Sequence, residues 1–112
     1  MFDKVAEEWA KHTIGPERGK TKSSQARKFY DYVLKLYESK ESFADKVLPF
    51  VKMFNSKAYY AKERGHASNE FVEMIKQCVN QANDKETLET FKLFFEAVIG
   101  FAKIKEDRYE TN

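Results

Sequence analysis

Apolar residues recur every three or four positions along most of this chain, and nowhere do they alternate for long enough to indicate a β-strand. This spacing gathers apolar side chains on one face of an α-helix. The clearest case is a segment from about Ser23 to Ser39, whose apolar stripe is Ala26, Phe29, Tyr30, Val33, Leu36 and Tyr37. The sequence therefore predicts an all-α fold.

Capping and helix-breaking residues divide this pattern into five expected helices. The dipeptide Gly15-Pro16 ends the first helix. Residues that favour helix N-caps stand at the starts of the second, fourth and fifth helices: Ser23 or Ser24, Ser68 or Asn69, and Asp84. Because the connections are short, we expect neighbouring helices to pack antiparallel in a compact five-helix bundle.

The third helix is expected from Ser42 to Gly65, where Ser42 and Asp45 form a variant capping box and Gly65 takes the C′ position. Pro49 interrupts it. Either the helix kinks there, or a short turn ends near Val47 and the main helix restarts with Pro49 in its first turn. Its expected apolar stripe is Phe43, Val47, Phe50, Val51, Phe54, Ala58 and Ala61.

A length of 112 residues suits one helical domain over residues 1–112, with a polar tail over about 106–112. The N-terminus lacks the apolar block of a signal peptide. The single cysteine, Cys78, cannot form an internal disulfide and fits a reducing compartment. We therefore predict a cytoplasmic protein that does not enter a membrane.

Groups that could support catalysis are few. His12, His66 and Cys78 show no metal-ligand spacing, and a cysteine at an apolar helical position is typical of a core residue. Glu96 is flanked by apolar residues, which fits either an outer helical stripe or a pair with a cation of a neighbouring helix. We predict no enzyme, no metal site and no cofactor.

Positive charge is concentrated in the middle of the chain. Residues 15–64 carry 12 Lys and Arg against 6 Asp and Glu, and no acidic residue stands between Lys46 and Lys62. At helical spacing, Lys28 lies on the same side as Lys35, and Lys57 on the same side as Arg64, with Tyr60 between the latter two. A solvated surface is one interpretation of this pattern. The missing acidic residues favour an anionic partner instead.

Two cations near the start of the second helix, Arg27 and Lys28, oppose the helix dipole at a cost of about 0.3 to 1 kcal/mol. A phosphate group there would meet free backbone N–H groups and the cations together. Such a site would bind a nucleic-acid backbone without reading its sequence.

Three blocks of the sequence resemble the small subunit of type III-A CRISPR effector (Csm) complexes. The blocks are "SSQARKFYDYVLKLYE", "KAYYAKERG" and "FKLFFEAVIGFAK", and in this order they cover roughly residues 20–105. The resemblance implies a non-catalytic helical subunit that is repeated along the complex and binds guide and target RNA. The implied partners are the CRISPR guide RNA, the target RNA, the backbone and large subunits of the complex, and further copies of the chain.

The resemblance carries three positions over as phosphate-contact candidates, and charge and position add three more: Arg27, Lys57 and Arg64, then Lys52, Lys28 and Lys22. Whether the free protein is a monomer or a homodimer stays open. Tyr59 and Tyr60 fit the core, a partner subunit or RNA. The alternative functions are a free-standing helical DNA-binding regulator and an adaptor that binds only proteins.

Overall fold

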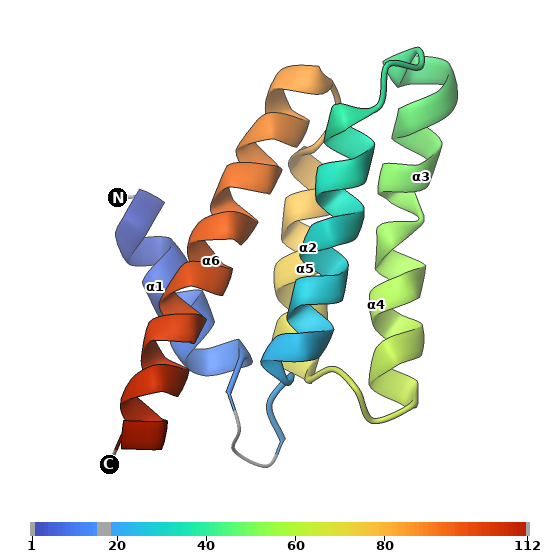
Figure 1. Ribbon diagram of the computed structural model, residues 1–112. Coiled ribbons are helices and arrows are strands. Elements are labelled where there is room, and N and C mark those ends of the chain that lie inside the picture. The colour runs from blue at the N-terminus through green and yellow to red at the C-terminus, as the bar shows by residue number, and fades with distance from the viewer. Residues whose placement is uncertain (1, 16–18, 112) are drawn as a thin grey trace.

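The computed structural model describes residues 2–15 and 19–111, with side chains over 4–15 and 19–104 (Figure 1). Its elements are α1 (Phe2–Thr13), α2 (Ser23–Glu38), a π-helical turn η1 (Phe43–Val47), α3 (Leu48–Lys52), α4 (Phe54–Glu63), α5 (Asn69–Gln81) and α6 (Lys85–Thr111). The turn η1, α3 and α4 together form the third expected helix. The described residues contain no strand, and the all-α prediction is confirmed.

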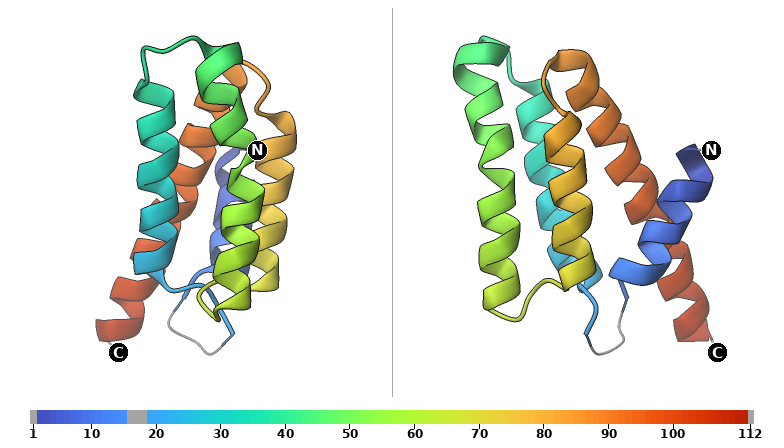
Figure 2. Two further views of the ribbon diagram at one scale, coloured as in Figure 1. Left: turned by 90° about the vertical axis from the view of Figure 1, so that its right-hand side faces the viewer. Right: turned by 180° about the vertical axis from the view of Figure 1, so that it is seen from behind.

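The helices α2, α5 and α6 and the arm formed by α3 and α4 run alternately up and down as a bundle (Figure 1). The α3–α4 arm lies over the seam between α2 and α5 (Figure 2). Helix α1 packs against α6 and α5 on the opposite side of the bundle from this arm. The bundle therefore presents α1 and the arm at opposite faces.

A cluster of phenylalanine rings occupies the centre of the bundle. Phe54, Phe71 and Phe95 are fully buried and come from α4, α5 and α6. Phe29 of α2 joins them, with ring centroids 5.6 Å from Phe54 and 5.3 Å from Phe71. Tilted and edge-to-face contacts at these separations are favourable beyond the area they bury. These rings pack the four helices α2, α4, α5 and α6 around one hydrophobic core.

Pro49 follows the second of the two expected arrangements. The turn η1 ends at Val47, and α3 begins at Leu48 with Pro49 in its first turn. The expectation that Phe50 is buried was wrong, since its side chain is 47% exposed. Val47 and Val51 take the inward positions one helical turn apart. Phe50 precedes Val51 by one residue, or about 100° around the helix, so it turns outward.

Three of the expected helix ends are confirmed. The Ser68 hydroxyl accepts the backbone N–H of Phe71 at 3.1 Å, and Asp84 Oδ1 accepts that of Thr87 at 2.8 Å. Gly65 has φ +79° and donates to the Lys62 carbonyl while His66 donates to Ala61. The last pair of bonds is a Schellman motif, which favours glycine at C′.

Two expected caps are wrong. Lys22 is the N-cap of α2, with extended backbone and no side-chain cap, so Ser23 and Ser24 lie inside the helix. Thr21 is buried and fixed by bonds to the Thr13 carbonyl and to Ser68, which sets where α2 begins. At η1 the side chain of Ser42 bonds that of Asp45 at 3.4 Å instead of capping the backbone.

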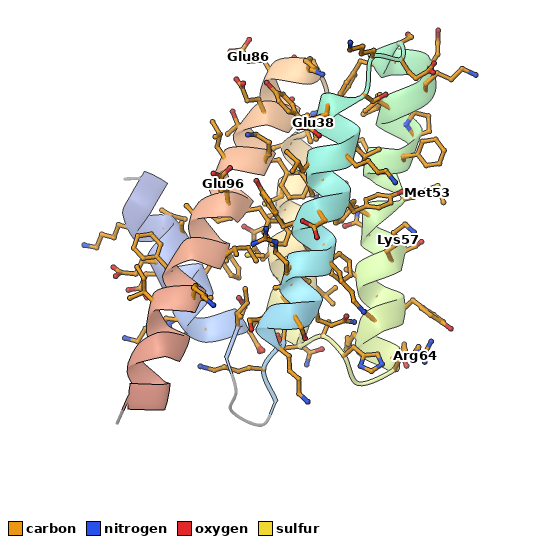
Figure 3. All side chains as sticks on the ribbon, in the orientation of Figure 1. Glu38, Met53, Lys57, Arg64, Glu86 and Glu96 are labelled. Carbon is orange, nitrogen blue, oxygen red and sulfur yellow. The ribbon has the colours of Figure 1, made fainter. Side chains whose placement is uncertain are left out.

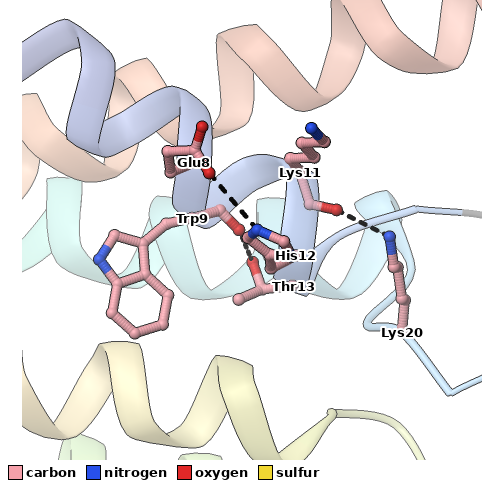
Figure 4. Close-up of polar contacts among 6 residues, drawn as sticks. All are labelled: Glu8, Trp9, Lys11, His12, Thr13 and Lys20. Carbon is pink, nitrogen blue, oxygen red and sulfur yellow. Dashed lines mark hydrogen bonds and ion pairs between the residues drawn. The ribbon is translucent and has the colours of Figure 1, made fainter.

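Lys20, which lies between α1 and α2, is bonded back to α1 (Figure 4). Lys20 Nζ donates to the Lys11 carbonyl at 2.7 Å, and the Thr13 hydroxyl donates to Trp9 within α1. The side chain of Lys20 is therefore fixed to the end of α1. Pro16, which was expected to end the first helix, lies outside the described residues.

Two phenol–carboxylate hydrogen bonds join α2 to α6. The Tyr30 hydroxyl donates to Glu96 at 3.0 Å, and the Tyr37 hydroxyl donates to Glu89 at 2.6 Å. Glu96 is exposed on the outer stripe of α6 and also lies 3.7 Å from Lys92 of its own helix (Figure 3). The outer-stripe interpretation of Glu96 is confirmed.

Helix α6 continues to Thr111, so residues 106–111, which were expected as a tail, are helical. In the part of the chain that the structure describes, no helix combines the length and apolar character needed to cross a membrane.

Candidate nucleic-acid interface

Two neighbouring hollows lie along the seam between α2 and the α3–α4 arm. The first, which we name the Tyr60 hollow, has a volume of about 280 Å³ and is lined by Gln25, Lys28, Phe29, Tyr32, Lys57, Tyr60 and Ala61. The second, the Phe50 hollow, has a volume of about 450 Å³ and is lined by Tyr32, Lys35, Leu36, Ser39, Glu41, Lys46, Val47 and Phe50. Because Tyr32 lines both, we treat them as one feature, the α2–α4 groove.

Helical periodicity brings the walls of this groove together. On α2, Gln25, Lys28, Tyr32 and Lys35 follow one another at spacings of three and four, which places them on one face. On α4, Lys57, Tyr60 and Arg64 do the same, and Figure 3 shows Lys57 and Arg64 along the arm. The groove is therefore built from α2 on one side, from α4 opposite it at the Tyr60 hollow, and from η1, α3 and the connection after α2 at the Phe50 hollow.

The charged residues that line the groove are mostly positive. Four lysines line it (Lys28, Lys35, Lys46 and Lys57), and the only carboxylate among the lining residues is Glu41. Across the described side chains, none of these four lysines forms an ion pair. Uncompensated cations along a concave surface attract anionic partners, because low-dielectric walls concentrate the field.

Aromatic rings alternate with these cations. Lys57 Nζ lies 4.8 Å from the centroid of the Tyr32 ring, and the Arg64 guanidinium lies 5.7 Å from that of Tyr60. Tyr60 is 64% exposed and its neighbour Tyr59 is 55% exposed, so the alternative that they belong to the core was wrong. Tyr59 pairs with Lys62 and does not line the groove.

The structure brings three of the six sequence-predicted residues together. Lys28 and Lys57 meet in the Tyr60 hollow, and Arg64 reaches its edge through Tyr60. Arg27 lies on the other flank of α2, facing α6, where it bonds Asp31 at 3.4 Å and lies over Tyr30. That flank holds a smaller hollow of about 210 Å³, lined by Ser23, Ser24, Arg27, Ile99, Ala102 and Lys103.

The other two predicted residues lie apart from the groove. Lys52 Nζ turns toward the end of α5 and donates to the Val79 carbonyl at 2.9 Å and to Asn83 at 3.0 Å. Lys22 is exposed at the N-cap of α2.

The position of the α2 start also revises the electrostatics. Because the helix begins at Ser23, Arg27 and Lys28 lie in its second turn, where the dipole field has largely faded. The dipole therefore contributes less to binding at Arg27 and Lys28 than their sequence positions suggested.

Several groove residues are absent from the six predicted positions: Gln25, Tyr32, Lys35, Lys46 and Phe50. The seven-residue spacing of Lys28 and Lys35 was a usable signal for Lys35. Lys46 and Phe50 had none, because the π-helical turn before α3 changes which residues face α2.

Side chains with catalytic potential are in unreactive settings. Burial raises the pKa of the Cys78 thiol to about 12, which keeps it protonated at neutral pH. Burial and the bond to Glu96 raise the pKa of Tyr30, and the bond to Glu89 raises that of Tyr37. Among the described residues, no three His, Cys, Asp or Glu side chains come together as a metal site would require.

The fold is a small helical bundle with a cationic, aromatic-lined groove and no catalytic or metal constellation among the described residues. The chain matches the family model described as Csm2 Type III-A over residues 1–108, and it belongs to that family. Csm2 is the small subunit of type III-A Csm complexes, and the family is a non-catalytic structural subunit. The resemblance inferred from three sequence blocks is confirmed. Neither a curated protein nor a solved structure matches the chain significantly.

Proposed function

We propose that the chain is repeated along a type III-A CRISPR RNA-guided complex and binds the backbone of guide and target RNA without sequence specificity. The observation that carries this proposal is the excess of positive charge in the α2–α4 groove, whose lining residues include four lysines and only one carboxylate. In this role the chain contacts the backbone and large subunits and further copies of itself. Its single cysteine is consistent with action in the cytoplasm.

The chemistry of the groove suits phosphate more than base recognition. Lysine ammonium groups contact phosphate oxygens as point charges and carry no sequence information. Arg64 can bond phosphate through two N–H groups at the open edge of the groove. Binding of this kind releases counterions from the RNA, so its strength falls steeply with salt concentration.

The test replaces Lys57 and Arg64 with alanine, singly and together, in the assembled complex. We expect weaker target-RNA affinity by a similar factor for unrelated sequences. For every phosphate that the variant no longer binds, the slope of log affinity against log salt should become shallower by roughly 0.7 to 0.9. Arg27→Ala is made separately because Arg27 lies on the flank facing α6, and we expect it to weaken binding as well.

The matched control is Lys4→Ala with Lys76→Ala, which removes the same charge from exposed positions on α1 and α5. This control should leave the target-RNA affinity and the slope of log affinity against log salt almost unchanged. If the groove variants and the control have the same salt slope as the wild type, the groove does not contact phosphate and the proposal is wrong.

A further inference from the structure

We propose that the Tyr60 hollow binds the base of an unpaired RNA nucleotide, which stacks on Tyr60 while Lys28 and Lys57 hold its flanking phosphates. This inference rests on the proposed function and adds a preference for unpaired nucleotides to it. It follows from the size of the hollow and from the side chains that line it.

Tyr60 is placed as a stacking platform. Its side chain is 64% exposed, and the Arg64 guanidinium lies 5.7 Å from the ring centroid. An aromatic ring that is open to solvent beside cations is the arrangement that single-stranded nucleic-acid sites use, because every base has a face that can stack. Stacking of this kind does not select one base over another.

The size of the hollow favours one base. Its volume of about 280 Å³ lies just below the range of roughly 300 to 1,000 Å³ typical of pockets for larger ligands. A base inside a duplex has both faces covered by its neighbours, so it cannot stack on Tyr60. Only a nucleotide that has left the stack can enter the hollow.

Gln25 adds a polar group to the lining of the hollow. Its side-chain amide makes no hydrogen bond within the described part of the chain. An amide offers both donors and an acceptor, so by rotating it can bond the exposed edge of any base. Gln25 can thus replace the hydrogen bonds that an inserted base loses at its edge, and it does so without favouring one base over another.

The lysines complete the site at the backbone. Lys28 comes from α2 and Lys57 from α4, so the two cations stand on opposite walls of the hollow. Lys57 is held above the Tyr32 ring at 4.8 Å, and no carboxylate lines this hollow. The phosphates on either side of an inserted base would therefore meet one cation each.

The test measures binding of the full chain at low salt to two RNA duplexes that differ only in the base of one nucleotide. Each duplex carries a single bulged nucleotide, which has its base in one duplex and is abasic in the other. The phosphate charge is then identical, so only base insertion distinguishes the two. We expect the wild type to prefer the bulge with a base by roughly 5- to 150-fold, the range that base–aromatic stacking provides.

Tyr60→Leu should reduce this ratio to about one, while Tyr59→Leu, which changes an exposed tyrosine outside the groove, should leave it unchanged. Lys57→Ala should weaken binding of both duplexes and preserve the ratio. A fluorescent adenine analogue in the bulge should be quenched by the wild type and by Tyr59→Leu, and less by Tyr60→Leu.

The outcomes separate the two proposals. Equal binding of the two duplexes by the wild type, with both weakened by Lys57→Ala, overturns base insertion and leaves backbone binding intact. A base preference that persists in Tyr60→Leu also overturns the assignment to this hollow. No effect of Lys57→Ala on either duplex contradicts the proposed function itself.

Discussion

Replacing Lys52 with methionine should lower stability and leave RNA affinity unchanged. Lys52 reaches from α3 to the end of α5, where its ammonium group donates to the Val79 carbonyl and to Asn83 Oδ1. Hydrogen bonds from a charged donor contribute roughly 1.5 to 3 kcal/mol when well shielded. Here the lysine is exposed, so water replaces part of that contribution.

The position of Lys52 adds a second favourable contribution. Its charge lies beside the carbonyl end of α5, which is worth about 0.3 to 1 kcal/mol at an exposed site. After the discount for exposure, we expect Lys52→Met to lower the free energy of unfolding by about 1 to 2 kcal/mol. For a chain of this length the melting temperature should fall by about 4 to 8 °C.

The assay is urea and thermal unfolding followed by circular dichroism, together with RNA affinity of the assembled complex. Lys46→Met is the matched control, because Lys46 is exposed in η1, just before α3, and forms no ion pair in the described part of the chain. It should keep its stability within about 0.5 kcal/mol and weaken RNA binding. Unchanged stability with weaker RNA binding in Lys52→Met would refute the structural role of Lys52.

Two further predictions concern pH. The Cys78 thiol ionises near pH 9 when unfolded but only near pH 12 when folded, so stability is lost as pH rises above 9, by about 1.4 kcal/mol at pH 10. Urea unfolding at pH 8 and 10 should show this loss in the wild type beyond that in Cys78→Ala, and parallel losses in both would contradict it. Bonds from Thr87 lower the pKa of Asp84, so its stabilising effect is present at neutral pH and is lost as pH falls below the ordinary Asp range. The stability of Asp84→Asn should therefore approach that of the wild type in acid, and a constant difference from pH 7 to pH 3 would argue against this role.

The features that the sequence predicted well depend on neighbouring residues. Ser68 and Asp84 each bond a backbone N–H three residues later, and the Gly65 turn closes within its own helix end. Such contacts are encoded locally, and spacing alone identifies them. The start of α2 near Ser23 was predicted correctly, but its N-cap was not, because Thr21, just before the cap, is fixed by Ser68, a residue 47 positions away.

The candidate site was also predicted only in part, because its geometry depends on contacts between distant segments of the chain. Spacing placed Lys57 and Arg64 on one side of a helix, but it could not say which neighbouring helix that side faces. Arg27 and Lys28 are adjacent in sequence, and yet one faces α6 and the other faces α4. Lys52 belongs to the same cationic segment, and only the packing of α3 against α5 assigns it to the end of α5.

The two phenol–carboxylate bonds between α2 and α6 fix the alignment of these helices. Tyr30 and Tyr37 are seven residues apart on α2, and their partners Glu96 and Glu89 are seven apart on α6 in the opposite direction. A slide by one helical turn would break both bonds at once, whereas a single bond could re-form with a neighbour. These two bonds, on the flank of α2 that faces away from the groove, thereby set the position of the α2 cations along the bundle axis. Substitutions at Glu89 or Glu96 should therefore change the alignment of Lys28 and Lys35 with the α3–α4 arm, although neither glutamate lines the groove.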